Sequence, residues 1–135
     1  MDDLQKVTAT VTALDWTPDA IAKLYDPSLS PFGPLATAGE VFKDCYLYMF
    51  EYDTQRAYVA VKPVSFHNGK RLDVVGARSI GDKMDGAAFA DAVNHIANYH
   101  GASLIGLMTK IPKIADKCIA AGFEITGAVL LKAVV

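Results

Sequence analysis

Between residues 6 and 15, apolar and polar residues alternate, as they do in a strand that buries one face. The apolar positions are Val7, Ala9, Val11 and Ala13. A short helix is expected next, because Thr17 and Pro18 are typical of an N-cap and of the first helical position. Helical spacing predicts a buried stripe of Ile21, Leu24 and Tyr25. Residues 27–40 contain three prolines and two glycines, which predicts a long surface loop.

Three strands are predicted in the middle of the chain. Aromatic and β-branched residues dominate 42–52 and 56–66, with a polar turn between them. Pro63 cannot donate a backbone hydrogen bond, so it indicates a bulge or an edge position in the second strand. Asn68-Gly69 is typical of a short hairpin and leads into a third strand at 71–77. We therefore expect three consecutive antiparallel strands.

Helices and strands alternate in the last third of the chain. Apolar residues recur at helical spacing from residue 86 to Gly101, a glycine typical of a helix end. The expected buried positions are Phe89, Val93, Ile96, Ala97 and His100. The short apolar run 103–109 suits a buried strand that is reached by a parallel crossover. Pro112 opens a second helix that ends before Gly122, and 123–135 suit one closing strand or two.

This order of elements predicts the α/β (α+β) class, with a mixed, mostly antiparallel sheet flanked by helices. The expected order is strand, helix, three strands, helix, strand, helix and strand. The chain has 135 residues, a usual size for one domain, and it shows no internal repeat. We therefore expect residues 1–135 to form a single domain.

Composition narrows the classes of function. The net charge is −2, whereas a general nucleic-acid-binding domain needs a basic stripe. No apolar run approaches the ~20 residues of a membrane-spanning helix, and the amino terminus lacks a signal-peptide pattern. Cys45 and Cys118 have no partners at metal-ligand spacing and are too few for a disulfide framework. We expect a cytoplasmic protein, or one packed into an assembly made inside the cell, that binds neither nucleic acid nor membrane.

The order of elements, together with the ending "IADKCIAAGFEITGAVLLK", resembles the GCN5-related N-acetyltransferase (GNAT) family. In that family a helix, a Gly-Phe pair and a closing strand form the carboxy-terminal third, and Gly122-Phe123 stands at the matching place. The resemblance in organisation covers roughly residues 5–135, and similarity of motifs covers about 72–131. It implies a GNAT-like acyl-CoA N-acyltransferase fold, acetyl-CoA as cofactor, and a small-molecule or protein amine as acceptor.

Members of the family hold acetyl-CoA through a Q/R-x-x-G-x-G/A loop, whose backbone N–H groups bind the pyrophosphate at the start of a helix. In a register that starts at Arg78, Arg78 and Gly81 match, but Lys83 replaces the final small residue. In a register that starts at Gly81, only Gly86 matches. The interval from Gly86 to Gly101 fits the roughly 15 residues of a four-turn helix, so the second register is the better structural match.

The resemblance therefore implies a cofactor site around the start of this helix. Its residues are Gly81, Lys83, Met84, Asp85, Gly86 and Ala87. Asp82 and Asp85 place negative charge beside the phosphates, which is unfavourable for an anion, and Lys83 offsets only part of it. The cofactor motif is therefore degenerate, and whether it still holds a cofactor stays open.

Three residues are candidates for the chemistry that the resemblance implies. Many members use a tyrosine four residues before the Gly of Gly-Phe as general acid, and that position here is Cys118. A general base should come from the central strands, where Asp73 is the first candidate and Glu51 the second. Core packing of Cys118 and an outward orientation of the two carboxylates are the structural alternatives. The three histidines lack metal-ligand spacing, so we expect no metal site.

Two functions follow as alternatives. The first is a small acetyl-CoA-dependent N-acetyltransferase with degenerate cofactor and catalytic motifs. The second is a non-catalytic structural or interaction protein, similar to the GNAT-like proteins associated with the virion of short-tailed phages. A sensor that binds CoA without turnover is a third alternative. A homo-oligomer or a virion partner stays open as well.

Overall fold

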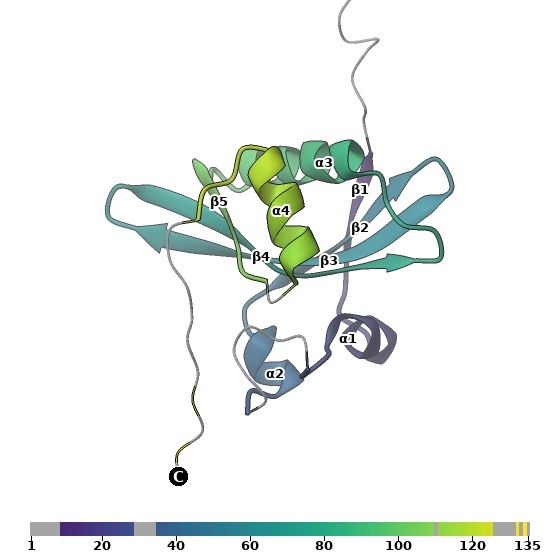
Figure 1. Cartoon of the computed structure of the whole chain (residues 1–135), viewed down its shortest axis with the longest axis horizontal. Helices are drawn as coiled ribbons and strands as arrows, with labels where there is room; N and C mark the ends of the chain where they lie inside the picture. Colours follow the sequence, from purple (N-terminus) through teal and green to yellow (C-terminus); the bar gives the residue numbers. More distant parts are fainter. Residues whose placement is uncertain (1–8, 29–34, 110, 126–131, 133, 135) are drawn as a thin grey trace, which may run out of the picture.

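The computed structural model describes residues 9–28, 35–109, 111–125, 132 and 134. Nine elements follow one another in this part of the chain (Figure 1). They are β1 (Thr10–Leu14), α1 (Pro18–Leu24), α2 (Ala38–Val41), β2 (Tyr46–Tyr52), β3 (Gln55–Phe66), β4 (Gly69–Ile80), α3 (Gly86–Tyr99), β5 (Leu104–Leu107) and α4 (Pro112–Ala120). Apart from α2, this order from β1 to α4 confirms the predicted one.

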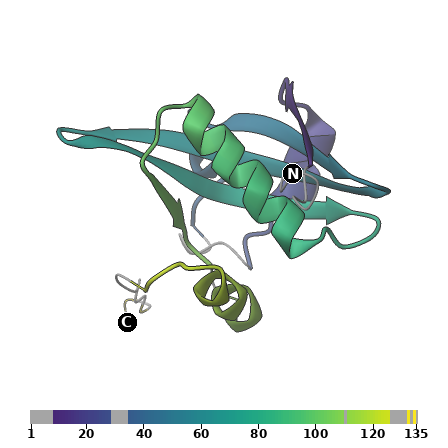
Figure 2. The same cartoon turned by 90° about the horizontal axis from the view of Figure 1, so that it is seen from above.

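The five strands form one mixed sheet in the order β1-β2-β3-β4-β5. Neighbouring strands are antiparallel up to β4, while β4 and β5 are parallel because α3 connects them. Figure 1 shows α3 above this sheet, with α1 and α2 beneath it. In Figure 2, α4 lies to the side of the sheet where β5 is. The predicted mixed, mostly antiparallel sheet flanked by helices is confirmed.

The main core lies between the sheet and α3. Its largest fully buried side chains are Phe50, Val59, Val61, Leu72 and Ile96. Burial of each of these stabilises the fold by about 1.5–3 kcal/mol. The buried residues of α3 are Ala88, Ala92, Val93, Ile96 and Ala97, and the two alanines nearest its start were not predicted. Phe89 and His100, which were predicted to be buried, are half-buried.

An aromatic cluster packs on the other side of the sheet, against α1 and α2. The Trp16 ring stacks on Phe42 with centroids 5.1 Å apart, and Tyr25 meets Phe42 edge-on at 6.5 Å. Gly76 of β4 lies under this cluster, because a Cβ added there would be 3.3 Å from Phe42 Cε1. The absence of a side chain at Gly76 therefore lets the α1 and α2 layer approach β4 closely.

The predicted loop 27–40 contains a helix that hydrophobic periodicity did not indicate. α2 is four residues long and is held by a capping box. Thr37 Oγ1 accepts a hydrogen bond from the Glu40 N–H at 3.2 Å, and Glu40 Oε1 accepts one from the Thr37 N–H at 3.0 Å. Residues 29–34 of this loop lie outside the described residues.

Two predictions near the amino-terminal half are wrong. β2 begins at Tyr46 rather than at residue 42, because Phe42 is the C-cap of α2 and Asp44 adopts a φ of 62°. In α1, Ile21 is 37% exposed rather than buried, and Ala20 is the residue that points inward.

β4 runs to Ile80, beyond its predicted end at residue 77. The register of β3 against β4 shifts between Ala60 and Val61, so that Val75 is an extra residue in β4. Pro63 lies in the part of β3 that has no β2 partner, since the pairing with β2 reaches only to Val61. Pro63 therefore occupies an edge position, which was one of its two predicted settings.

β5 and α4 lie where a strand and a helix were predicted. Gly101 and Gly122 follow α3 and α4 with φ values of 71° and 101°. Leu104, however, is 66% exposed, so the prediction of a buried strand is wrong for the start of β5. Residues 123–125 are not part of a strand, and 126–131, 133 and 135 of the predicted closing strand lie outside the described residues.

Candidate functional site

β4 extends beyond the end of β5, and we call the place where their pairing stops the β4–β5 fork. Their parallel pairing covers Arg71–Val74 and Leu104–Leu107 and then stops, while β4 continues to Ile80. The extra residue Val75 comes directly after the last pair. β5 itself ends at Leu107, and because a bulge bends and twists its strand, β4 changes course where the pairing stops. Beyond it, β4 pairs only with β3 among the described residues, so alternate peptide groups of β4 point away from β3.

The loop between β4 and α3 is held against the sheet. Gly81 has a φ of 77°, a conformation that favours glycine. Met84 is buried, and its N–H donates to Ser79 Oγ at 3.2 Å. The Asp85 N–H donates to Gln55 Oε1 at 2.6 Å. Of the six predicted cofactor residues, only Met84 is buried, so its side chain serves the core and the other five face solvent.

α3 starts at Gly86, as predicted, and Asp85 is its N-cap. Asp85 Oδ1 accepts a hydrogen bond from the Ala88 N–H at 3.0 Å. This carboxylate therefore takes part of the position where an external anion would meet the helix N-terminus. A Cβ added at Gly86 would meet nothing within 4 Å, so space is open over this end of the helix. The implied cofactor site thus combines one unobstructed glycine with a carboxylate of its own.

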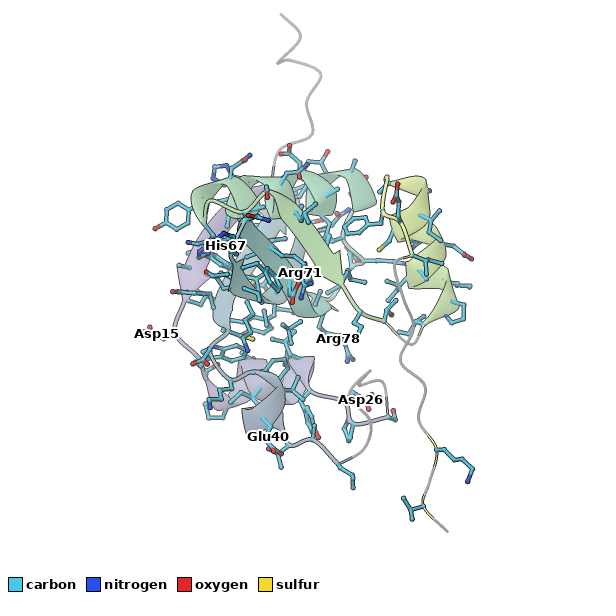
Figure 3. The ribbon with its side chains drawn as sticks, turned by 90° about the vertical axis from the view of Figure 1, so that its left-hand side faces the viewer. Asp15, Asp26, Glu40, His67, Arg71 and Arg78 are labelled. Carbon is cyan, nitrogen blue, oxygen red and sulfur yellow. The ribbon has the colours of Figure 1, made fainter. Side chains whose placement is uncertain are left out.

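Asp73, the first candidate base, is paired with Arg71 two residues earlier on β4. Arg71 Nε and Nη2 donate to Asp73 Oδ1 and Oδ2 at 2.5 and 2.9 Å. The hydrogen bond with Asp73 raises the pKa of Arg71, and the Arg71 guanidinium also lies 5.3 Å from the centre of the Phe66 ring. The pair packs over β5, because a Cβ at Gly106 would overlap Asp73 Oδ1 (Figure 3 shows Arg71 beside β5). Both oxygens of the candidate base are therefore engaged.

Glu51, the second candidate base, lies in another part of the sheet. Glu51 is exposed, and in the backbone register of the sheet it lies opposite Arg56 of β3. Asp73 lies opposite Lys62 of the same strand. Arg56 and Lys62 are six positions apart, which corresponds to about 20 Å along a strand. The two carboxylates cannot act on the same substrate atom.

Cys118, the candidate acid, is a half-buried, free thiol on α4. Burial raises the pKa of its thiol, so the thiol stays protonated at neutral pH. Its carbonyl accepts hydrogen bonds from the Ala121 and Phe123 N–H groups, which close the end of α4. Cys45, which precedes β2, is also free, and burial raises its pKa to about 11. Neither cysteine is a ready thiolate nucleophile.

Sequence reasoning missed two features of this region. Arg71 was not connected with Asp73, although residues two apart in a strand share a face and can pair when their charges are opposite. Asp85 was treated as a cofactor-site residue with an unfavourable charge and not as a helix cap, although an aspartate directly before the first helical residue is a usual N-cap signal. Arg71 engages the carboxylate of the first candidate base, and the start of α3 engages the carboxylate of Asp85, a predicted cofactor residue.

Two hollows of the described surface lie away from the predicted site residues. One, of about 640 Å³, lies between β1 and α3 and is lined mainly by Asp91, Asn94, His95 and Asn98. The other, of about 160 Å³, lies beside Trp16 and Phe42.

Within the described residues, no group of three or more His, Cys, Asp or Glu side chains could hold a metal ion. No helix in this part of the chain is long and apolar enough to cross a membrane.

Comparison of the chain with known protein families, with curated proteins and with solved structures finds no match. A functional assignment therefore depends on the topology, on the β4–β5 fork and on the start of α3.

Proposed function

We propose that this chain is a GNAT-like domain that acts as an acetyl-CoA-dependent N-acetyltransferase with degenerate motifs. One observation carries the proposal: β4 and β5 are parallel, their pairing ends next to the Val75 bulge, and they are connected through a helix that starts at Gly86. The order of elements from β1 to α4 supports it, because it is the order that the resemblance to the family implies. Acetyl-CoA would lie along the free edge of β4, with its phosphates near Gly86.

The chemistry of such an enzyme is a direct transfer. The amine attacks the thioester carbonyl, the new C–N bond forms, the C–S bond breaks, and a proton passes from the amine to the leaving thiolate. The N–H groups of β4 that point away from β3 would be suited to stabilise the oxyanion. Asp73 would accept the amine proton through water, because each carboxylate oxygen keeps a lone pair besides the one used by Arg71. The protonated Cys118 is the candidate acid.

A non-catalytic structural or interaction role, in the cytoplasm or in a virion, is the second candidate. Two contacts favour it. Arg71 engages both oxygens of Asp73, and Asp85 caps the helix end where a phosphate would bind. In this role the fold keeps its stability while the chemistry is lost.

Isothermal titration with acetyl-CoA and with CoA tests the proposal. We expect binding of one ligand per chain. The Gly86→Glu variant should lose it, because its side chain fills open space and adds a charge without disturbing the fold. Asn94→Glu, which adds the same charge at an exposed position on α3, is the matched control and should bind normally. No heat of binding up to about millimolar ligand would exclude both an enzyme and a CoA sensor.

Release of free thiol from acetyl-CoA then separates the two candidates. A panel of small primary amines and lysine-containing peptides would serve as acceptors. Acceptor-dependent release that falls in Asp73→Asn supports the enzyme, whereas binding without release for every acceptor supports the non-catalytic role.

A further inference from the structure

β1 is the outermost strand of the described sheet, and its outer edge is open. All five of its residues pair with β2 in an unbroken antiparallel register. Alternate peptide groups of β1 therefore point away from β2, where no strand of the described part of the chain lies. Natural edge strands are usually blocked by a bulge, a proline or a charged side chain, and β1 has none of the three. This edge is therefore suited to pair with a further strand.

The hollow of about 640 Å³ adjoins this edge, on the face of the sheet that α3 covers. β1 contributes only the short side chains of Ala9 and Val11 to its lining, while most of the α3 residues in the lining are polar. Side chains of a strand alternate between the two faces of a sheet, so every second side chain of a strand added beside β1 would enter the hollow. The edge thus offers backbone pairing, and the hollow offers room for side chains.

The charge of the hollow indicates which strand would fit. Asp91 of α3 is half-buried and is the one acidic residue in the lining as described. Neither of the two ion pairs in the described part of the chain involves Asp91. A lysine or arginine side chain that enters the hollow would be complementary to this carboxylate. The side chains of a second β1 on this face would all be small and uncharged, so a second copy neither fills the hollow nor pairs with Asp91.

We propose that the open edge of β1 and the hollow between β1 and α3 bind an extended peptide segment of a protein partner. The segment adds to the sheet as a strand beside β1 and places a lysine or arginine side chain against Asp91. β1 and β5 lie at opposite edges of the sheet, so this surface is separate from the β4–β5 fork. The proposal therefore does not depend on the proposed function.

A display library of random octapeptides, selected on the full chain, tests the proposal. We expect the enriched peptides to lack proline and to share a lysine or arginine at one position. The best of them should shift the backbone amide NMR signals of Thr10–Leu14 and of the α3 residues that line the hollow. Asp91→Asn should weaken its binding by about fivefold, because an ion pair is lost. Asp116→Asn, at an exposed position on α4, is the matched control and should leave binding unchanged.

Two variants of the selected peptide separate the charge from the backbone pairing. With glutamine in place of its basic residue, the peptide should bind wild type and Asp91→Asn equally. Two further peptides carry N-methyl groups on the odd or on the even peptide groups, and one of these sets should abolish binding because it removes the hydrogen bonds to β1.

Four results would overturn the proposal. The first is a selection that enriches no peptide, and the second is a set of shifts centred away from β1 and α3. The third is an unchanged affinity in Asp91→Asn or in both N-methylated peptides. The fourth is a dimer in sedimentation analysis whose β1 amides are protected from hydrogen exchange without peptide, because a second copy would then occupy the edge.

Discussion

Alanine at position 106 is expected to destabilise the protein through its effect on the Arg71–Asp73 pair. A Cβ at Gly106 would overlap Asp73 Oδ1 and lie 3.1 Å from both Cδ and Nε of Arg71. The side chains of Arg71 and Asp73 are 41% and 26% exposed, so breaking their ion pair alone costs only about 0.2–1 kcal/mol. Overpacking against β5 adds about 1–3 kcal/mol, and the lower chain entropy of alanine offsets about 0.4–1 kcal/mol. We therefore expect a loss of about 1–2 kcal/mol in the free energy of unfolding.

Urea denaturation of four proteins measures this effect as a double-mutant cycle: wild type, Gly106→Ala, Asp73→Ala and the double variant. In the Asp73→Ala background the overlap is gone, so Gly106→Ala should cost less than about 0.5 kcal/mol. The same cost of Gly106→Ala in both backgrounds would refute the idea that position 106 is kept small by the ion pair.

Three further predictions concern single side chains. Asp85→Ala removes the N-cap of α3 and should lower the free energy of unfolding by about 1 kcal/mol, whereas Asp85→Asn should keep most of it. Burial, followed by the charge of Lys70, lowers the pKa of His100 below 6.5, so folding disfavours its protonated form. Stability should therefore fall as the pH drops below 6.5, and a thermal melting series in which His100→Gln shows the same fall would contradict this. Because the pKa of Cys45 is about 11, native alkylation by iodoacetamide at pH 8 should be on the order of a hundredfold slower than in guanidine, measured by peptide mass spectrometry.

Much of the fold could be predicted because its signals are local. Thr17 and Pro18 mark the start of α1, and its Thr17 cap hydrogen bond is present at 3.2 Å. Gly101 and Gly122 mark the ends of α3 and α4 by the positive φ that glycine allows. The parallel pairing of β4 and β5 followed from one helix between two strands.

The features that were missed depend on weaker or more distant signals. α2 is too short for hydrophobic periodicity, and only its Thr37–Glu40 capping box could have indicated it. Val75 carries no sequence mark of a bulge, because the bulge arises from the register of β4 against β3.

Backbone amide NMR during a titration with acetyl-CoA tests the placement of the cofactor most directly. If acetyl-CoA lies in the β4–β5 fork, the largest shifts should fall on residues 75–87, which run from the bulge through the loop to the start of α3. The Gly86→Glu variant should lose these shifts. The absence of any shift at about millimolar ligand, or shifts centred on the hollow between β1 and α3, would contradict the proposal.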